Sequence, residues 1–366
     1  MDFFYNDFDN CQGNVIDSLK MLLYQRHEDI FERLDFDNDN VFLEPLLFSY
    51  ITQENNDWLD SIIYGYEKNP KQKIIVFTNK NGVIYIPKIG YFYTDQKSTQ
   101  LLLGKSNEFY LRDINNNNEI PYRFEPIKLL NENIELVKTQ HPLFESFFFF
   151  FSIVVDVEIE NCYDKHILHF NNALNVIKEY YPGYFSLIKK SVKKVMIYDG
   201  HPNSFAAIQA HNMIFINAHD ENDEIFFLDH ILHEGAHVIF NTLTYHSKIE
   251  LFTVPFKTIL SDITKDDRDH GEIYGRFHGM FTQSNINTCM ETCINEKVFH
   301  GKQHKELLGR FSSNMKRFRA GIEKFNIPNI YKEEGKLWYE FFTKRYNSLY
   351  EKNELTLSRK VCKLKS

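Results

Sequence analysis

The stretch Leu228–Phe240, with the sequence LDHILHEGAHVIF, decides how the rest of the chain is interpreted. Its residues 233–237, HEGAH, match the H-E-x-x-H pattern. On a helix, His233 and His237 lie one turn apart on the same face, so both imidazoles can bind one metal ion. Glu234 then lies close enough to reach a ligand on that metal. The stretch therefore predicts a helix that carries a metal site.

The helix around this motif is predicted to be buried. Residues 225–240 are apolar on almost every side, and His, Asp and Glu are their only polar groups. Buried ionisable groups need partners, and a metal ion is an effective one. The acidic segment 220–224 supplies an N-cap and first-turn acids of the kind with which helices begin.

Composition predicts a folded protein. The chain has 366 residues, of which 43% are hydrophobic and 16% aromatic, enough for a large core. The acidic N-terminus lacks the features of a signal peptide, and the most apolar run, 147–155, is too short to span a bilayer. Five cysteines without a framework spacing suit a reducing compartment. We therefore expect a cytoplasmic protein that is not bound to a membrane.

Charge is spread unevenly along the chain. The formal net charge is −8, but residues 301–366 hold 16 Lys and Arg against 7 Asp and Glu, a net of +9. The first 300 residues therefore carry −17, which argues against a general nucleic-acid binder. We interpret the basic tail as solvated helices rather than as a surface for an acidic partner.

Hydrophobic spacing predicts a series of elements. We expect helices at 14–34, at 127–151 with an interruption at Pro142, at 167–181 and after residue 300. Short β-branched and aromatic runs at 74–77, 83–86 and 91–93 predict strands, and Asn81-Gly82 is a hairpin signal between the first two. A strand is expected at 192–198. Two more, at 204–210 and 213–217, are expected to form a hairpin around His211-Asn212.

These elements predict an α+β fold with three regions. Residues 1–120 form a partly β N-terminal region, which we consider for peptide binding, and residues 121–300 form the catalytic domain. Residues 301–366 form a basic helical region that packs on it. We expect the catalytic domain to be mainly helical and zincin-like, with a small sheet beside the H-E-x-x-H helix that can hold an extended peptide by strand addition.

A catalytic metal needs a third protein ligand and an open position. The metzincin class is excluded because Phe240 and Leu243 replace its Gly and His. A thermolysin-like site would use a downstream Glu, and Glu272 and Glu291 are the candidates. However, the segment METCIN at residues 290–295 does not reproduce the usual N-E-x-x-S-D pattern.

His278 is the other candidate for the third ligand. Gly271, Gly275 and Gly279 repeat every four positions and predict a smooth helical stripe along which another helix can approach closely. His278 lies beside that stripe and would face the metal helix. The alternative is a core histidine with a backbone partner.

The order of these features resembles a known family. A strand region, an H-E-x-x-H helix and then Gly275-x-x-His278-Gly279 are similar to the HExxH-motif proteins that modify ribosomally made peptides, which are iron(II)/2-oxoglutarate-dependent peptide β-hydroxylases. The resemblance covers residues 204–294, a quarter of the chain. It implies that Fe(II) is bound by His233, His237 and His278, with 2-oxoglutarate and O2 completing the site and a precursor peptide as substrate.

Several roles remain open within this resemblance. The distal carboxylate of 2-oxoglutarate needs a cation, for which Arg268 is favoured and Arg276 is the other candidate. His230 and His270 are candidates for contact with the ligands or the substrate.

Glu234 divides the two enzymatic interpretations. In a zinc metallopeptidase it would be the general base, whereas in an oxygenase it needs no acid–base role. A third alternative is a peptide-binding scaffold whose metal is structural. The sequence does not predict the oligomeric state.

Overall fold

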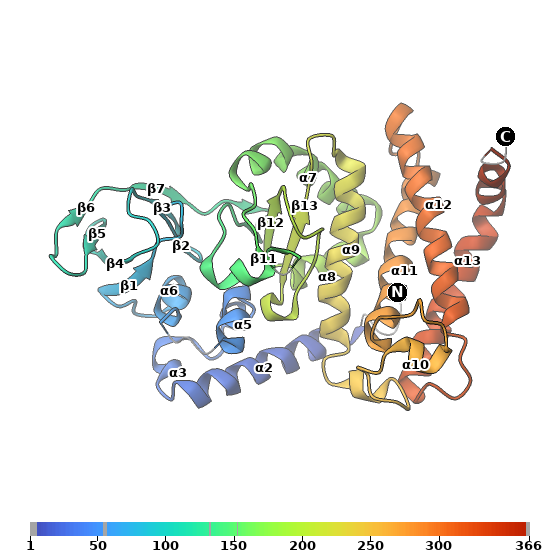
Figure 1. Ribbon diagram of the computed structural model, residues 1–366, viewed down its shortest axis with the longest axis horizontal. Coiled ribbons are helices and arrows are strands. Elements are labelled where there is room, and N and C mark those ends of the chain that lie inside the picture. Colours follow the sequence, from blue (N-terminus) through green and yellow to red (C-terminus); the bar gives the residue numbers. More distant parts are fainter. Residues whose placement is uncertain (1–5, 54–56, 132, 152, 364–366) are drawn as a thin grey trace. The chain divides into compact units, whose positions relative to one another are not determined.

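The computed structural model describes residues 6–53, 57–131, 133–151 and 153–363, with side chains described up to residue 353. The chain is of mixed α and β structure, 53% helical and 16% strand, which agrees with the predicted α+β class. It divides into two compact units. Figure 1 labels many of the helices and strands that make up each unit. Unit 1 comprises Met1–Gln12, Leu168–Ile188 and Asn222–Ser366, and unit 2 comprises Gly13–Ile167 and Lys189–Glu221.

Helices open the chain. The predicted helix at 14–34 is confirmed, although it is divided into two by a turn at residues 27–29. The helices are α2 (Phe8–Arg26), α3 (Ile30–Arg33), α4 (Asp39–Phe42), α5 (Pro45–Thr52) and α6 (Leu59–Ile63), followed by the 3-10 turn η1 (Tyr64–Tyr66). Leu23, Ile30 and Leu46 are among their side chains that are fully buried in the core of unit 2.

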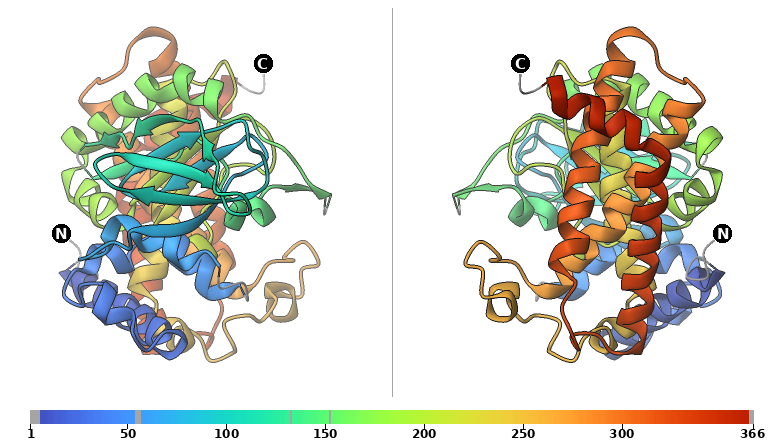
Figure 2. Two further views of the ribbon diagram at one scale, coloured as in Figure 1. Left: turned by 90° about the vertical axis from the view of Figure 1, so that its left-hand side faces the viewer. Right: turned by 90° about the vertical axis from the view of Figure 1, so that its right-hand side faces the viewer.

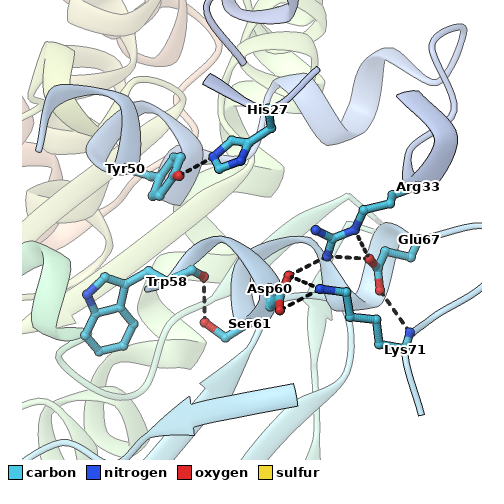
Figure 3. Close-up of polar contacts among 8 residues, drawn as sticks. All are labelled: His27, Arg33, Tyr50, Trp58, Asp60, Ser61, Glu67 and Lys71. Carbon is cyan, nitrogen blue, oxygen red and sulfur yellow. Dashed lines mark hydrogen bonds and ion pairs between the residues drawn. The ribbon is translucent and has the colours of Figure 1, made fainter. Parts of the chain in front are cut away.

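An ion-pair network ties these short helices together (Figure 3). The Arg33 guanidinium donates to Asp60 at 2.6 Å and to Glu67 at 2.7 Å, and Lys71 reaches Asp60 at 2.9 Å. Burial alone would raise the pKa of Asp60, but Lys71 and Arg33 bring it below its ordinary value. The network therefore joins α3, α6 and the segment that leads into the first strand.

Two small antiparallel sheets follow. One has the order β1-β4-β5-β6 and the other β2-β3-β7. Their strands are β1 (Lys73–Phe77), β2 (Val83–Ile86), β3 (Gly90–Tyr93), β4 (Gln100–Lys105), β5 (Phe109–Asp113), β6 (Glu119–Ile120) and β7 (Arg123–Pro126).

The strands at 74–77, 83–86 and 91–93 are confirmed, but the predicted hairpin at Asn81-Gly82 is wrong. β1 pairs with β4, and β2 pairs with β3, so the two strands on either side of the turn enter different sheets. The turn does form: the Asn79 side-chain oxygen accepts from the backbone N–H groups of Asn81 and Val83, and Gly82 has φ +78°. Local chemistry therefore specified a turn but not the partner of each strand.

A third sheet has the order β13-β12-β9-β8. Its strands are β8 (Leu129–Leu130), β9 (Ile134–Leu136), β12 (Lys194–Tyr198) and β13 (Met213–Asn217). The predicted strands at 192–198 and 213–217 are confirmed. β12 lies parallel to both β13 and β9, and every residue of β12 and β13 is buried. Burial on both faces explains why these strands have continuous apolar sequences.

Two further predictions are corrected in this part of the chain. Residues 127–151 are not a helix: they form β8, β9, the 3-10 helix η2 (Pro142–Phe147) and β10 (Phe149–Phe150). The segment 204–210 is not a strand, because only Phe205 bridges to Phe215 and residues 208–210 form the 3-10 turn η3. Apolar spacing misled in both places. For residues 134–136 the deciding contact is the pairing of β9 with β12, which lies about 60 positions later in the chain.

A buried charge cluster lies where β9 and β12 are paired. Lys194, which is paired in register with Glu135, extends its ammonium to Glu135 at 2.9 Å, Glu44 at 3.1 Å and the Tyr85 hydroxyl at 2.6 Å. The three charged side chains are at most 4% exposed. Burial alone would lower the pKa of Lys194, but Glu135 and Glu44 raise it above its ordinary value.

Unit 1 is helical. Its main helices are α9 (Glu224–Leu243), α11 (Ile273–Asn295), α12 (Gly301–Lys324) and α13 (Glu333–Lys363), with the shorter η4 (Ser247–Glu250) and α10 (Leu260–Thr264) between them. α11 packs against α9, α12 and α13, and the right-hand view of Figure 2 shows α12 and α13 side by side.

The predicted helices at 167–181, around 228–240 and after residue 300 are therefore confirmed. The first of them is α7 (Glu160–Tyr180), which is followed by α8 (Pro182–Ser191); each of these two helices contributes residues to both units. Within the ranges that the structure describes, no helix is long and apolar enough to cross a membrane.

Candidate functional site

Helix α9 places the two histidines of the H-E-x-x-H motif. It begins at Asp223, whose carboxylate accepts a hydrogen bond from the Ile225 N–H at 2.9 Å, as the acidic segment predicts. The rings of His233 and His237 are 5.1 Å apart between centroids, and both side chains are partly exposed. The single-turn spacing therefore aligns the two imidazoles as expected.

Helix α11 brings His278 to the same place. Its Nε2 lies 3.2 Å from Nδ1 of His237, and the two ring centroids are 4.5 Å apart. The side chain is only 4% exposed. α11 therefore places His278 against His237, and His237 in turn lies beside His233 on the preceding turn of α9.

His278 also approaches the backbone. Its Nε2 lies 3.4 Å from the Ala236 carbonyl oxygen, longer than a good hydrogen bond of this kind. The alternative of a core histidine with a backbone partner thus rests on a weak contact, and the shorter contact is with His237.

The packing that holds His278 in place differs from the prediction. A Cβ added at Gly275 or at Gly279 would meet nothing within 4 Å, so no helix lies against these two glycines of the predicted stripe. Large side chains make the contact instead: Phe240 of α9 packs on the rings of Tyr274, His278 and Phe281 at centroid distances of 4.7–5.9 Å. Aromatic packing therefore sets the distance between the helices.

Burial keeps the three imidazoles neutral. It lowers the pKa of His233 to about 4 and that of His278 to about 3. The pKa of His237 falls well below its ordinary value, again mainly through burial, and His278 and His233 lower it further. Neutral imidazole is the form that binds metals.

Glu234 lies on the buried side of the same helix and is 3% exposed. Burial, followed by the charge of Asp229, raises the pKa of its carboxyl to about 8. Asp229 itself is held by α12, where Arg310 lies 3.0 Å and Asn314 3.4 Å from its oxygens.

The distance between His237 and His278 suits two ligands of one metal. Two nitrogens bound at about 2.1 Å lie roughly 3.0–3.4 Å apart for angles between octahedral and tetrahedral. Over the described ranges, however, no group of three or more His, Cys, Asp or Glu side chains is placed to hold a metal ion.

The carboxylates considered as third ligands lie elsewhere. Glu291 follows His278 by 13 positions, roughly 20 Å along α11, and accepts a hydrogen bond from Asn353 at 3.0 Å. Glu272 precedes the first residue of α11 and is exposed. Neither carboxylate is therefore held next to His237 and His278.

The predicted cations are on the surface. Arg268 is 88% exposed and pairs with Asp266 at 2.7 Å in the loop before α11. Arg276 is exposed too, and its side chain folds over Gly271. After burial, Asp229 and His230, the charge of Arg317 on α12 has a smaller effect on the pKa of His233 and lowers it; Arg317 is exposed as well.

The two other predicted histidines differ from each other. His230 stacks on Phe226 at 3.9 Å, and its Nδ1 lies 2.9 Å from the carbonyl oxygen of the same residue. Burial lowers the pKa of His230; the charge of Asp229 opposes this change, and that of Arg310 adds to it. His270 is exposed in the loop before α11. His230 thus belongs to the packed face of α9, one turn before His233.

Sequence reasoning missed that α12 is a neighbour of the site: its Arg310 and Asn314 contact Asp229, one turn before His233. Arg310, Asn314 and Arg317 have the spacing i, i+4, i+7, which places them on one helical face. That spacing is a signal that the sequence contains.

Known proteins provide no further assignment. A scan against protein-family models finds no match, and a search of curated proteins finds none either.

Proposed function

We propose that this chain is an iron(II)- and 2-oxoglutarate-dependent dioxygenase that hydroxylates the β-carbon of a residue in a ribosomally made precursor peptide. The observation that supports it most is the 3.2 Å approach of His237 to His278, beside His233 on the preceding turn. The resemblance of residues 204–294 to peptide β-hydroxylases supplies the reaction class.

The chemistry of the proposed ligands would suit iron. Three neutral imidazoles suit Fe(II) as well as Zn(II), because affinity alone does not select between them. His237 and His278 lie at a distance that two ligands of one metal would have, and His233 on the preceding turn would be the third ligand. When bound, iron with 2-oxoglutarate and O2 supplies the oxidation of an unactivated C–H bond.

The residues around the histidines have separate tasks in this proposal. His278 is buried, whereas His233 and His237 are partly exposed, so substrate would approach from the exposed edges of the two α9 rings. The aromatic side chains of Phe240, Tyr274 and Phe281 exclude water on the opposite side. Glu234 would orient its neighbours rather than transfer a proton.

The distal carboxylate of 2-oxoglutarate requires a cation, and three arginines are candidates. Arg268 and Arg276 are the residues that the sequence predicts. Arg317 of α12, which is exposed too, joins them because its charge contributes, after burial, Asp229 and His230, to the pKa of His233. The guanidinium fork of any of them could bind a carboxylate through two hydrogen bonds.

The proposal includes the zincin-like architecture predicted from the sequence, with a sheet that holds an extended peptide. It also includes the cytoplasm as the compartment of the reaction. In support, Cys11, Cys162, Cys289 and Cys293 are all free thiols.

A zinc metallopeptidase with Glu234 as general base is the competing function. The presence of a buried Glu234 next to His233 favours it. It would require His278 as third ligand, because Glu291 lies too far along α11 and Glu272 is exposed.

Metal and co-substrate binding distinguish the two. Under anaerobic conditions, Fe(II) and 2-oxoglutarate should give a visible charge-transfer band with the wild-type protein. His278→Ala should lose the band and weaken iron binding at least about 100-fold, since a direct ligand matters more than the residues that support it. His246→Ala, which removes an exposed histidine outside the site, is the matched control and should retain both.

Product analysis completes the test. With O2 and a peptide substrate, succinate should form together with a peptide heavier by one oxygen atom. If zinc instead supports peptide cleavage while iron yields no succinate, the oxygenase proposal is wrong.

A further inference from the structure

A cavity in unit 2 has no role in the proposed reaction. Its volume is about 610 Å³, within the range of about 300–1,000 Å³ that is typical of ligand sites. It lies at one end of the sheet β1-β4-β5-β6, where β1 ends at Phe77, β4 begins at Gln100 and Ile114 follows β5. We call it the sheet-end pocket. All of its lining residues belong to unit 2, so it is separate from the histidines of α9 and α11.

The floor of the sheet-end pocket is apolar. Trp58 is 8% exposed, and Phe77 and Pro142 are half-buried. The Trp58 ring packs on the Phe77 ring at 4.0 Å between centroids and meets the His141 ring edge-on at 4.9 Å. Its indole points away from the ion pairs of Arg33 (Figure 3). So little exposed ring surface gives no broad platform for stacking a sugar or a nucleobase, whereas an apolar side chain can pack against it.

Polar groups border this floor. The hydroxyl of Ser98 and the side-chain amides of Gln100 and Asn115 are exposed, and they have no hydrogen bond to any part of the chain that the structure describes. Each amide can both donate and accept. A peptide backbone offers an N–H and a C=O at almost every residue and therefore matches such groups.

The charges of the pocket favour a neutral or basic ligand. Glu145 is exposed, and among the described residues its carboxylate has no cationic partner. Lys80, which also lines the pocket, is already paired with Asp156. A phosphate or another anion would therefore meet a carboxylate whose charge is not balanced.

The apolar surface continues from the pocket along the outer face of the sheet. Phe77 is paired in register with Gln100, and Ile75 with Leu102, so these side chains lie in successive rows on one face. Ile75 is 45% exposed, and Ile114 at the pocket is 41% exposed. A ligand that fills the pocket can therefore extend along this face, which suits a chain better than a compact small molecule.

We propose that the sheet-end pocket binds an extended peptide segment in which an apolar residue stands next to a basic one. The apolar side chain packs on the floor between Trp58 and Pro142. The amides of Gln100 and Asn115 bind the peptide backbone, and the basic side chain pairs with Glu145. This binding site goes beyond the proposed reaction and does not depend on it.

Selection from a phage-displayed library of random peptides on the full-length protein tests the proposal. The enriched sequences should share an aromatic or aliphatic residue beside Lys or Arg. Synthetic copies are then titrated into the Trp338→Phe variant, in which Trp58 is the remaining tryptophan. Its fluorescence should change with the peptide concentration, because the ligand packs against its ring.

Two variants with matched controls locate the binding site. Gln100→Tyr places a larger side chain over the floor and should weaken binding at least about tenfold, since the apolar side chain of the peptide loses its place. Gln72→Tyr makes the same change at an exposed position outside the pocket and should bind as before. Glu145→Lys should weaken the binding of basic peptides roughly three- to tenfold at low salt, whereas Glu108→Lys, also exposed and outside the pocket, should not.

Three results would overturn the proposal: a library that yields no enriched sequence, enriched peptides that bind Gln100→Tyr as tightly as Gln72→Tyr, or a stronger fluorescence response to glucose or ATP than to the peptides. Near-ultraviolet circular dichroism should show that every variant is folded. None of these measurements involves a metal or a modified peptide, so the proposed function is tested independently.

Discussion

Lys194 shows how one residue can hold together elements that are distant in sequence. Its ammonium contacts Glu44 before α5, Glu135 on β9 and the hydroxyl of Tyr85 on β2. A buried ion pair adds little stability over apolar residues of the same shape, but removal of one partner leaves uncompensated charge in the interior. Lys194 is therefore a sensitive position for stability, whatever the protein does.

Lys194→Met should lower the free energy of unfolding of unit 2 by about 3–5 kcal/mol, because two carboxylates would remain buried without their cation. Urea unfolding measures this change. Lys68→Met is the matched control: Lys68 lies 3.5 Å from Asp35, with both side chains 48% exposed, so its loss should change stability by less than about 1 kcal/mol. Equal losses in both variants would show that the cluster does not act as described.

At the scale of the element, α9 and α11 were predictable to different degrees. α9 has an N-cap at Asp223, an acidic residue in its first turn, Glu224, and many apolar residues, all of which are local signals. α11 was recognised as a helix, but the reason for its proximity to α9 was misjudged. The predicted glycine stripe has no neighbour at Gly275 and Gly279, whereas bulky aromatic residues form the contact.

Two glycines occupy equivalent positions in their helices but differ in the space around them. They therefore test whether that space determines the effect of an added methyl group on stability. Gly275 is the third residue of α11 and Gly335 the third of α13, where a Cβ would overlap the Leu251 carbonyl oxygen. Gly275→Ala should stabilise unit 1 by about 0.5–1 kcal/mol, since its Cβ meets nothing and Ala is the better helix former. Gly335→Ala should destabilise it by about 1–3 kcal/mol through overpacking.

Thermal unfolding, followed by the fluorescence of Trp338, measures both changes. Because the two substitutions are chemically identical and occupy the same helical position, a shift of the same sign would contradict the packing described for α13.

At the scale of the whole molecule, the division into two units can be followed by fluorescence. The chain contains two tryptophans: Trp58 in unit 2 and Trp338 in unit 1. Trp338 is 1% exposed and packs on Phe240 at 5.2 Å and Phe281 at 5.9 Å, the aromatic residues that also surround His278. It is thus a local reporter of the candidate metal site.

Metal should stabilise unit 1 selectively. In a Trp58→Phe background, zinc at about 100 times its dissociation constant should raise the unfolding free energy reported by Trp338 by roughly 2.7 kcal/mol. In a Trp338→Phe background, zinc should leave the unfolding free energy reported by Trp58 unchanged. Each variant is compared with its own metal-free form, so the cost of the tryptophan substitution cancels.

His237→Ala in the Trp58→Phe background should abolish the zinc effect. A shift that persists in this variant would place the bound metal elsewhere in the chain.

By itself, the sequence determined what depends on neighbouring residues: helix α9 with its cap and its two aligned histidines, most of the helices, and the apolar runs that became β12 and β13. The tertiary structure decided which strands pair, because β1 meets β4 and β12 meets β13 across distances that no local pattern encodes. It also decided that His278 lies 3.2 Å from His237, and that Arg310 and Asn314 of α12 contact Asp229 of α9. Such contacts arise from packing between helices distant in sequence, whereas the spacing within each helix fixes only the face on which a residue lies.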